Sequence, residues 1–99
     1  MNYRFHPAAL AEHLDQVAFY ESQLRGLGAD YLAAFDRFIQ QICSHPQAFA
    51  QIQKTALRRA VMKRYPFQLI YMVLENQVYI LAIAHHKRRP SYWAIRQIE

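Results

Sequence analysis

The sequence has few of the residues that build covalent or metal-held frameworks. It contains one cysteine, Cys43, in 99 residues, which excludes an internal disulfide and a cysteine-rich metal site. It contains only two glycines and no low-complexity run, which argues against a disordered chain. Cys43 shares an apolar helix face with Ile39 and Ile42, so we interpret it as a core residue rather than a nucleophile. Folding therefore depends on hydrophobic packing.

Long apolar runs and targeting signals are also missing. The longest apolar stretch, Phe67 to Ala84, is interrupted by a Glu-Asn-Gln triplet, whereas a membrane-spanning helix needs about 20 apolar residues. The first ten residues, MNYRFHPAAL, lack the apolar centre of a signal peptide. We therefore expect a cytoplasmic protein with no membrane partner. With 54% hydrophobic residues in 99, the chain is long enough for a single domain spanning residues 1–99.

Acidic residues are scarce in the second half of the chain. Residues 1–56 carry four basic and five acidic side chains, a net charge of −1. Residues 57–99 carry eight basic and two acidic side chains, a net charge of +6. This asymmetry predicts an anionic partner for the second half. The partner could be nucleic acid or an acidic protein segment, because charge alone does not distinguish them.

The first half has the pattern of a helical hairpin that follows a short strand, YRF. Pro7 suits the first turn of a helix that runs to about Arg25, and Gly26 and Gly28 then end it. A second helix ends before Pro46. The apolar residues at helical spacing are Leu10, Leu14, Val17 and Leu24 in the first helix, and Tyr31, Leu32, Phe35, Phe38, Ile39 and Ile42 in the second.

The second half changes to the pattern of strands. We expect strands at Arg58–Arg64, at FQLIYMVL and at VYILAIAH, with Glu75–Gln77 joining the last two as a hairpin. These last strands are apolar on both faces, so both faces require cover. The helical hairpin covers one face and a short helix within Ser91–Ile98 covers part of the other. We expect a protein partner to cover the rest; the alternative is cover by the chain's own loops.

The order of elements is therefore β-α-α-β-β-β with a short C-terminal helix, an α+β fold. With this order, the sequence resembles the RelE/ParE superfamily of bacterial type II toxins. The matching pieces span nearly the whole chain, and their combination is more specific than any one of them. They are FHPAA (5–9), FYE (19–21), GLG (26–28), a P-x-x-F (46–49), RRAVMKRYPFQLIY (58–71) and AIAHHKRRPSYWAIR (82–96).

The resemblance implies a twisted, mainly antiparallel sheet packed on a helical hairpin. It also implies a cognate antitoxin, small and acidic, that wraps the toxin, with operator DNA reached only indirectly through the antitoxin. Members of the ParE branch inhibit DNA gyrase and serve in plasmid stabilisation. Members of the RelE branch cut mRNA on the ribosome. The fold by itself does not decide between these branches.

The chain has side chains suited to the RelE-like alternative, a metal-independent endoribonuclease. Such chemistry needs a proton acceptor, a proton donor, cations for the phosphorane charge and an aromatic platform for a base. On a continuous strand, Arg59 and Lys63 would point to the same side. The candidate catalytic residues under this alternative are His85, Arg88, Tyr92, Arg59 and Lys63. Spacing typical of a metal site is absent from the sequence, and we expect neither a metal nor another cofactor.

The C-terminal motif favours the ParE-like reading, which has no catalytic residues. ParE-like members resemble this chain in ending with R-x-P-x-Y-W-x-x-R, here Arg88 to Arg96, whereas RelE-like nucleases more often end with a catalytic Tyr or His. We expect Pro90 to start the last helix, and Tyr92 and Trp93 to anchor it on the sheet. The predicted partner-binding residues are Arg58, Arg59, Arg64, Lys87, Arg88, Arg89, Tyr92 and Trp93. A third alternative is an inactive homologue that only binds an antitoxin.

Overall fold

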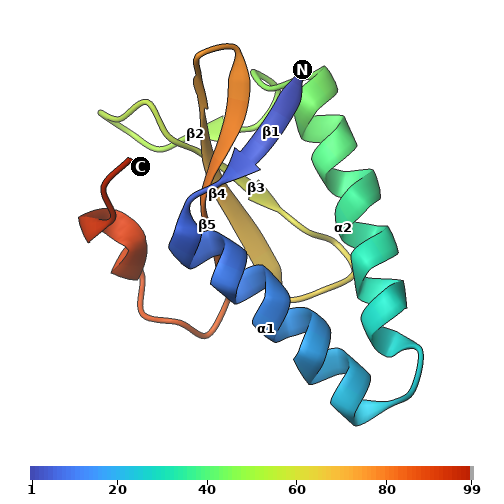
Figure 1. Ribbon diagram of the computed structural model, residues 1–99. Coiled ribbons are helices and arrows are strands. Elements are labelled where there is room, and N and C mark those ends of the chain that lie inside the picture. The colour runs from blue at the N-terminus through green and yellow to red at the C-terminus, as the bar shows by residue number, and fades with distance from the viewer. Residues whose placement is uncertain (99) are drawn as a thin grey trace.

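The computed structural model describes residues 1–98 and has two helices on one face of a five-stranded sheet (Figure 1). The helices are α1 (Pro7–Gln23) and α2 (Leu27–Ser44), and the short 3-10 helix η1 (Tyr92–Ile95) lies on the other side of the sheet (Figure 1). The strands are β1 (Asn2–Phe5), β2 (Ala50–Gln51), β3 (Arg58–Val61), β4 (Phe67–Leu74) and β5 (Gln77–His85). The predicted α+β fold on a helical hairpin is confirmed.

The sheet has the order β1-β5-β4-β3-β2, so the two apolar strands β4 and β5 lie at its centre. All neighbouring strands are antiparallel except β1, which pairs in parallel with β5. The β4–β5 hairpin turns through Glu75 and Asn76, which both have the positive φ that a type I′ turn requires. Gln77, expected in the turn, is instead the first residue of β5. The short strand β2 was not predicted.

The connection between the two helices depends on glycine and on one carboxylate. Gly26 has a φ of 88°, and a Cβ on Gly28 would lie 2.9 Å from the carbonyl oxygen of Val17. The Glu21 carboxylate accepts hydrogen bonds from the backbone N–H groups of Gly26 and Gly28. The GLG segment therefore lets α1 and α2 approach closely, as antiparallel neighbours, where bulkier residues would separate them.

The buried face of α1 differs from the predicted one. Leu10, Leu14 and Leu24 are 42%, 58% and 65% exposed, whereas Ala9 and His13 are buried against the sheet and α2. The prediction of Leu10, Leu14 and Leu24 as a core stripe is wrong. Aromatic packing decides the orientation: the ring of His13 lies 4.3 Å from that of Phe35, between centroids. Leucine spacing alone did not reveal this contact.

The second face of the sheet is covered by the chain itself. Ile70, Tyr79 and Ala82 on this face are fully buried, and Trp93 of η1 packs on them with only 5% of its surface exposed. Ile52 and Leu57, from the loop between β2 and β3, extend the cover. The expectation that a protein partner covers this face is therefore wrong.

Candidate functional site

A basic pocket lies beside the turn that follows β5. We call it the C-terminal basic pocket; its volume is about 200 Å³. It brings together Arg59 of β3 with Arg88 and Arg89, although these residues are far apart in the sequence. The pocket is lined by Arg59, Gln68, Ala84, His85, His86, Arg88, Arg89, Pro90, Ser91, Tyr92 and Trp93. Five of the eight predicted partner-binding residues meet here; Arg58, Arg64 and Lys87 do not line it.

The arginines of this pocket carry uncompensated charge. Over residues 1–98, no carboxylate forms a salt bridge with Arg59, Arg88 or Arg89. The guanidinium of Arg88 stacks on the ring of Tyr92, 3.9 Å from its centroid, and this contact fixes its position. A cluster of unpaired cations in a concave site raises the local positive potential and attracts anionic groups.

Arg58 has a structural role. Its guanidinium donates to the carbonyl oxygen of Phe49 at 2.7 Å and to the side-chain oxygen of Gln47. These bonds hold the chain between α2 and β2 against β3. Arg58 therefore differs from Arg59, which follows it in sequence but points to the opposite face of the sheet, as alternation along a strand requires.

Lys63 and Arg64 also lie away from the C-terminal basic pocket. Strand β3 ends at Val61, two residues before Lys63. The alternation of side chains along a strand therefore does not extend to Lys63 and does not place it beside Arg59. The predicted Arg59–Lys63 pair is therefore wrong. Arg64 forms a salt bridge of 2.9 Å with Asp30 of α2, and the Tyr65 hydroxyl donates to the same carboxylate.

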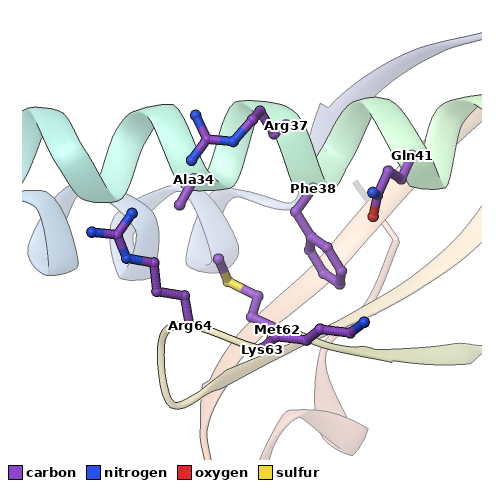
Figure 2. A pocket seen from close by; sticks show the side chains of 7 residues that line it. All are labelled: Ala34, Arg37, Phe38, Gln41, Met62, Lys63 and Arg64. Carbon is purple, nitrogen blue, oxygen red and sulfur yellow. The ribbon is translucent and has the colours of Figure 1, made fainter.

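Lys63 and Arg64 instead line a pocket against α2, shown in Figure 2. We call it the α2 pocket; its volume is about 260 Å³. In Figure 2 the ring of Phe38 points from α2 toward Met62 and Lys63 in the bend after β3. The lining residues are Ala34, Arg37, Phe38, Gln41, Met62, Lys63 and Arg64. Sequence reasoning missed this pocket because α2 and the bend are joined only in space.

A buried ion pair holds the C-terminal segment in place. Arg96 donates two hydrogen bonds to the Glu12 carboxylate, at 3.0 and 2.8 Å, and the side chains of this pair are only 14% and 15% exposed. The Tyr92 hydroxyl donates to Glu12 at 2.6 Å. Glu12 also accepts from the backbone N–H of Ile83, and Arg96 donates to the carbonyl oxygen of Leu81. This cluster was not predicted; the isolated Glu12 and the Arg of the terminal motif were its only signals.

The ionisation of this cluster follows from its contacts. Burial by itself would raise the pKa of Glu12, but hydrogen bonds from Arg96, Tyr92 and Ile83 outweigh it and hold that pKa below its ordinary value. Burial, then the hydrogen bond to Glu12, raises the pKa of Tyr92 to about 12. The Tyr92 hydroxyl is therefore engaged in the fold and is poorly suited to proton transfer near neutral pH.

The histidine of the nuclease alternative is partly engaged as well. His85 Nδ1 accepts a hydrogen bond of 3.0 Å from the backbone N–H of Lys87, and its ring packs edge-on against Phe67. His85 also borders a larger groove of about 420 Å³ between α1 and β5, with apolar walls from Phe19, Tyr20, Phe67 and Ile83. Of the five candidate catalytic residues, His85, Arg88, Tyr92 and Arg59 meet in one pocket and Lys63 does not.

Among the described residues, no group of three or more His, Cys, Asp or Glu side chains is placed to hold a metal ion. No helix within residues 1–98 is both long and apolar enough to cross a membrane.

Comparison with known proteins supplies the family. No protein of curated function matches the sequence significantly. A profile described as "ParE toxin of type II toxin-antitoxin system, parDE" matches residues 3–90, which include both helices, β2 to β5, β1 except for its first residue, and most of the C-terminal basic pocket. The chain therefore belongs to the ParE toxin family of type II toxin–antitoxin systems.

Proposed function

We propose that this chain is a toxin that inhibits DNA gyrase and is neutralised by a cognate antitoxin. Membership of the ParE toxin family supports the toxin role and implies an antitoxin partner. In the proposal, the C-terminal basic pocket is the surface that contacts gyrase. The proposal includes the cytoplasm as the place of action and plasmid stabilisation as the biological outcome.

The observation that carries this proposal is the contrast between cations and proton-transfer groups in the C-terminal basic pocket. Arg59, Arg88 and Arg89 form no salt bridge within the described part of the chain, so they remain available to an anionic surface. The Tyr92 hydroxyl, by contrast, is committed to Glu12. A site with free cations and an occupied hydroxyl is suited to binding rather than to acid–base catalysis.

A supercoiling assay tests the proposal directly. Purified toxin is added to gyrase, ATP and relaxed plasmid, and in parallel to translating ribosomes with labelled mRNA. We expect loss of supercoiling and intact mRNA. Ribosome-dependent cleavage with unaffected gyrase would replace the proposal by the nuclease alternative, and activity in neither assay would indicate a homologue that only binds its antitoxin.

One observation favours the nuclease as the second candidate. His85, Arg59 and Arg88 line the same pocket, and an imidazole beside two guanidinium groups is a combination that can serve phosphodiester cleavage. His85→Gln distinguishes the two candidates. Under the nuclease alternative it removes the candidate catalytic imidazole, so mRNA cleavage would fall by about 100-fold or more.

A further inference from the structure

We propose that the α2 pocket is where the antitoxin anchors, by inserting one apolar side chain that is flanked by acidic residues. This inference rests on the toxin–antitoxin function proposed above and adds the location and the chemistry of the contact. It separates the antitoxin anchor from the C-terminal basic pocket, which lies on the other side of the sheet.

The size of the α2 pocket indicates a side chain rather than a small molecule. Its volume of about 260 Å³ is below the range of about 300–1,000 Å³ that is typical of small-molecule sites. Pockets of this scale in protein interfaces commonly receive one anchoring side chain, which contributes a large share of the binding energy.

The chemistry of the pocket indicates what that side chain is. Phe38, Met62 and Ala34 give it an apolar floor, and Met62 is almost fully buried beneath it (Figure 2). Phosphate groups of a nucleic acid gain nothing from an apolar floor, whereas an aliphatic or aromatic side chain is removed from water there. The floor therefore favours a protein partner over DNA or RNA.

The charges around the pocket indicate the flanking residues. Arg64 is paired with Asp30, but Arg37 and Lys63 form no salt bridge within residues 1–98. Two unpaired cations beside an apolar floor are complementary to Asp or Glu next to an apolar residue. In such an interface the apolar contact supplies most of the affinity and the charges supply specificity and fast association.

The arrangement along α2 also suits a partner segment of some length. Ala34, Arg37, Phe38 and Gln41 follow the i, i+3, i+4, i+7 spacing of one helix face, so they form a continuous strip beside the bend at 62–64. A segment lying along this strip would contact the floor and both cations together.

The test measures binding of the protein encoded next to this toxin gene, the candidate antitoxin, by titration calorimetry. The double variant Arg37→Glu, Lys63→Glu reverses both free charges, and we expect its Kd to rise at least about 100-fold. The control variant Arg25→Glu, Lys54→Glu makes the same change in net charge at exposed positions outside the pocket. We expect the Kd of the control to stay within about threefold of that of the unmodified toxin.

A second variant tests insertion itself. Gln41→Trp leaves every charge in place and fills the pocket from an exposed helix position, so it too is expected to weaken binding, by about tenfold or more. If Gln41→Trp binds normally, the cations act only by long-range attraction and the anchoring inference is overturned. Equal Kd values for the charge-reversal variant and its control would overturn it as well.

The experiment separates this inference from the function on which it rests. Thermal unfolding first checks that each variant is folded. If the unmodified toxin neither binds the neighbouring protein nor inhibits gyrase, the proposed function fails. If it does both and the α2 variants bind the antitoxin normally, only the location of the anchor is wrong.

Discussion

The two basic pockets of this toxin differ in the residues that lie beneath their cations. In the C-terminal basic pocket, the residues beneath the free cations stabilise the fold. Trp93 is buried there, and the Tyr92 hydroxyl is hydrogen-bonded to Glu12. In the α2 pocket, the free cations lie above an apolar floor that the fold buries only in part, because Phe38 is half-buried. Net charge alone would not distinguish the two pockets. Their floors assign the first to charged surfaces and the second to a partner that brings an apolar side chain.

The largest expected difference between the two regions is in stability. Trp93→Ala removes the side chain that covers Ile70 and Ala82, and should lower the free energy of unfolding by about 3–5 kcal/mol. Phe38→Ala, at a half-buried position, should cost clearly less. Urea denaturation followed by circular dichroism measures both. Equal losses would mean that the two floors contribute equally to the stability of the fold.

The buried ion pair gives a second contrast. Glu12→Gln leaves Arg96 without its counter-charge, which should lower the free energy of unfolding at pH 7 by about 3 kcal/mol. Since the folded pKa of Glu12 is lowered, its contribution is present above the unfolded value of about 4.5 and is lost as the pH falls below it. Stability measured from pH 7 to pH 3 should therefore decline less steeply in Glu12→Gln. An unchanged acid slope would show that other carboxylates control it.

Function gives the third contrast. Arg88→Glu with Arg89→Glu should raise the toxin concentration needed for half-inhibition of gyrase by about 100-fold, because two attractive contacts become repulsive. Arg25→Glu with Lys54→Glu is again the matched control. Gyrase inhibition that survives the reversal of Arg88 and Arg89 would move the target surface away from the C-terminal basic pocket.

The smallest expected effect is a difference between the helical hairpin and the C-terminal segment in how their stability depends on pH. Burial lowers the pKa of His13, and Asp36 offsets this only in part. Because the folded pKa of His13 lies below its ordinary value of 6.5, the unfolded chain binds more protons than the fold as the pH drops through that value, so stability falls there. Hydrogen exchange should show faster opening of α1 and α2 over this range, with η1 and β5 unaffected. His13→Gln should reduce this pH dependence; equal pH dependence would exclude His13 as its source.

The sequence predicted most of the architecture, since periodicity marks long elements well. Both helices, the β4–β5 hairpin and the anchoring of Trp93 were predictable from apolar spacing and from Pro and Gly. The position of the last helix was predicted less well. Ser91, with a φ of 63°, separates Pro90 from the 3-10 helix, which begins at Tyr92.

The predictions that were wrong concerned features set by contacts between segments that are distant in the sequence. The orientation of α1 is set by His13 against Phe35, and the division of the basic residues is set by the end of β3 at Val61. Neither can be read from local spacing. The same applies to Glu12, whose three partners lie 71 to 84 residues further along the chain. Five of the eight predicted partner-binding residues line one pocket and the other three lie elsewhere, and their role in binding a partner stays a prediction.

The Glu12–Arg96 pair has a consequence for solubility. Strand β1 pairs with β5 only from Gln77 to Ile80, so the outer edge of residues 81–85 would otherwise offer its backbone to an added strand from another molecule. Glu12 occupies the N–H of Ile83 and Arg96 occupies the carbonyl of Leu81. A toxin set free when its antitoxin is lost would thus carry its own barrier against edge-to-edge polymerisation, and loss of this barrier would open residues 81–85 to strand addition.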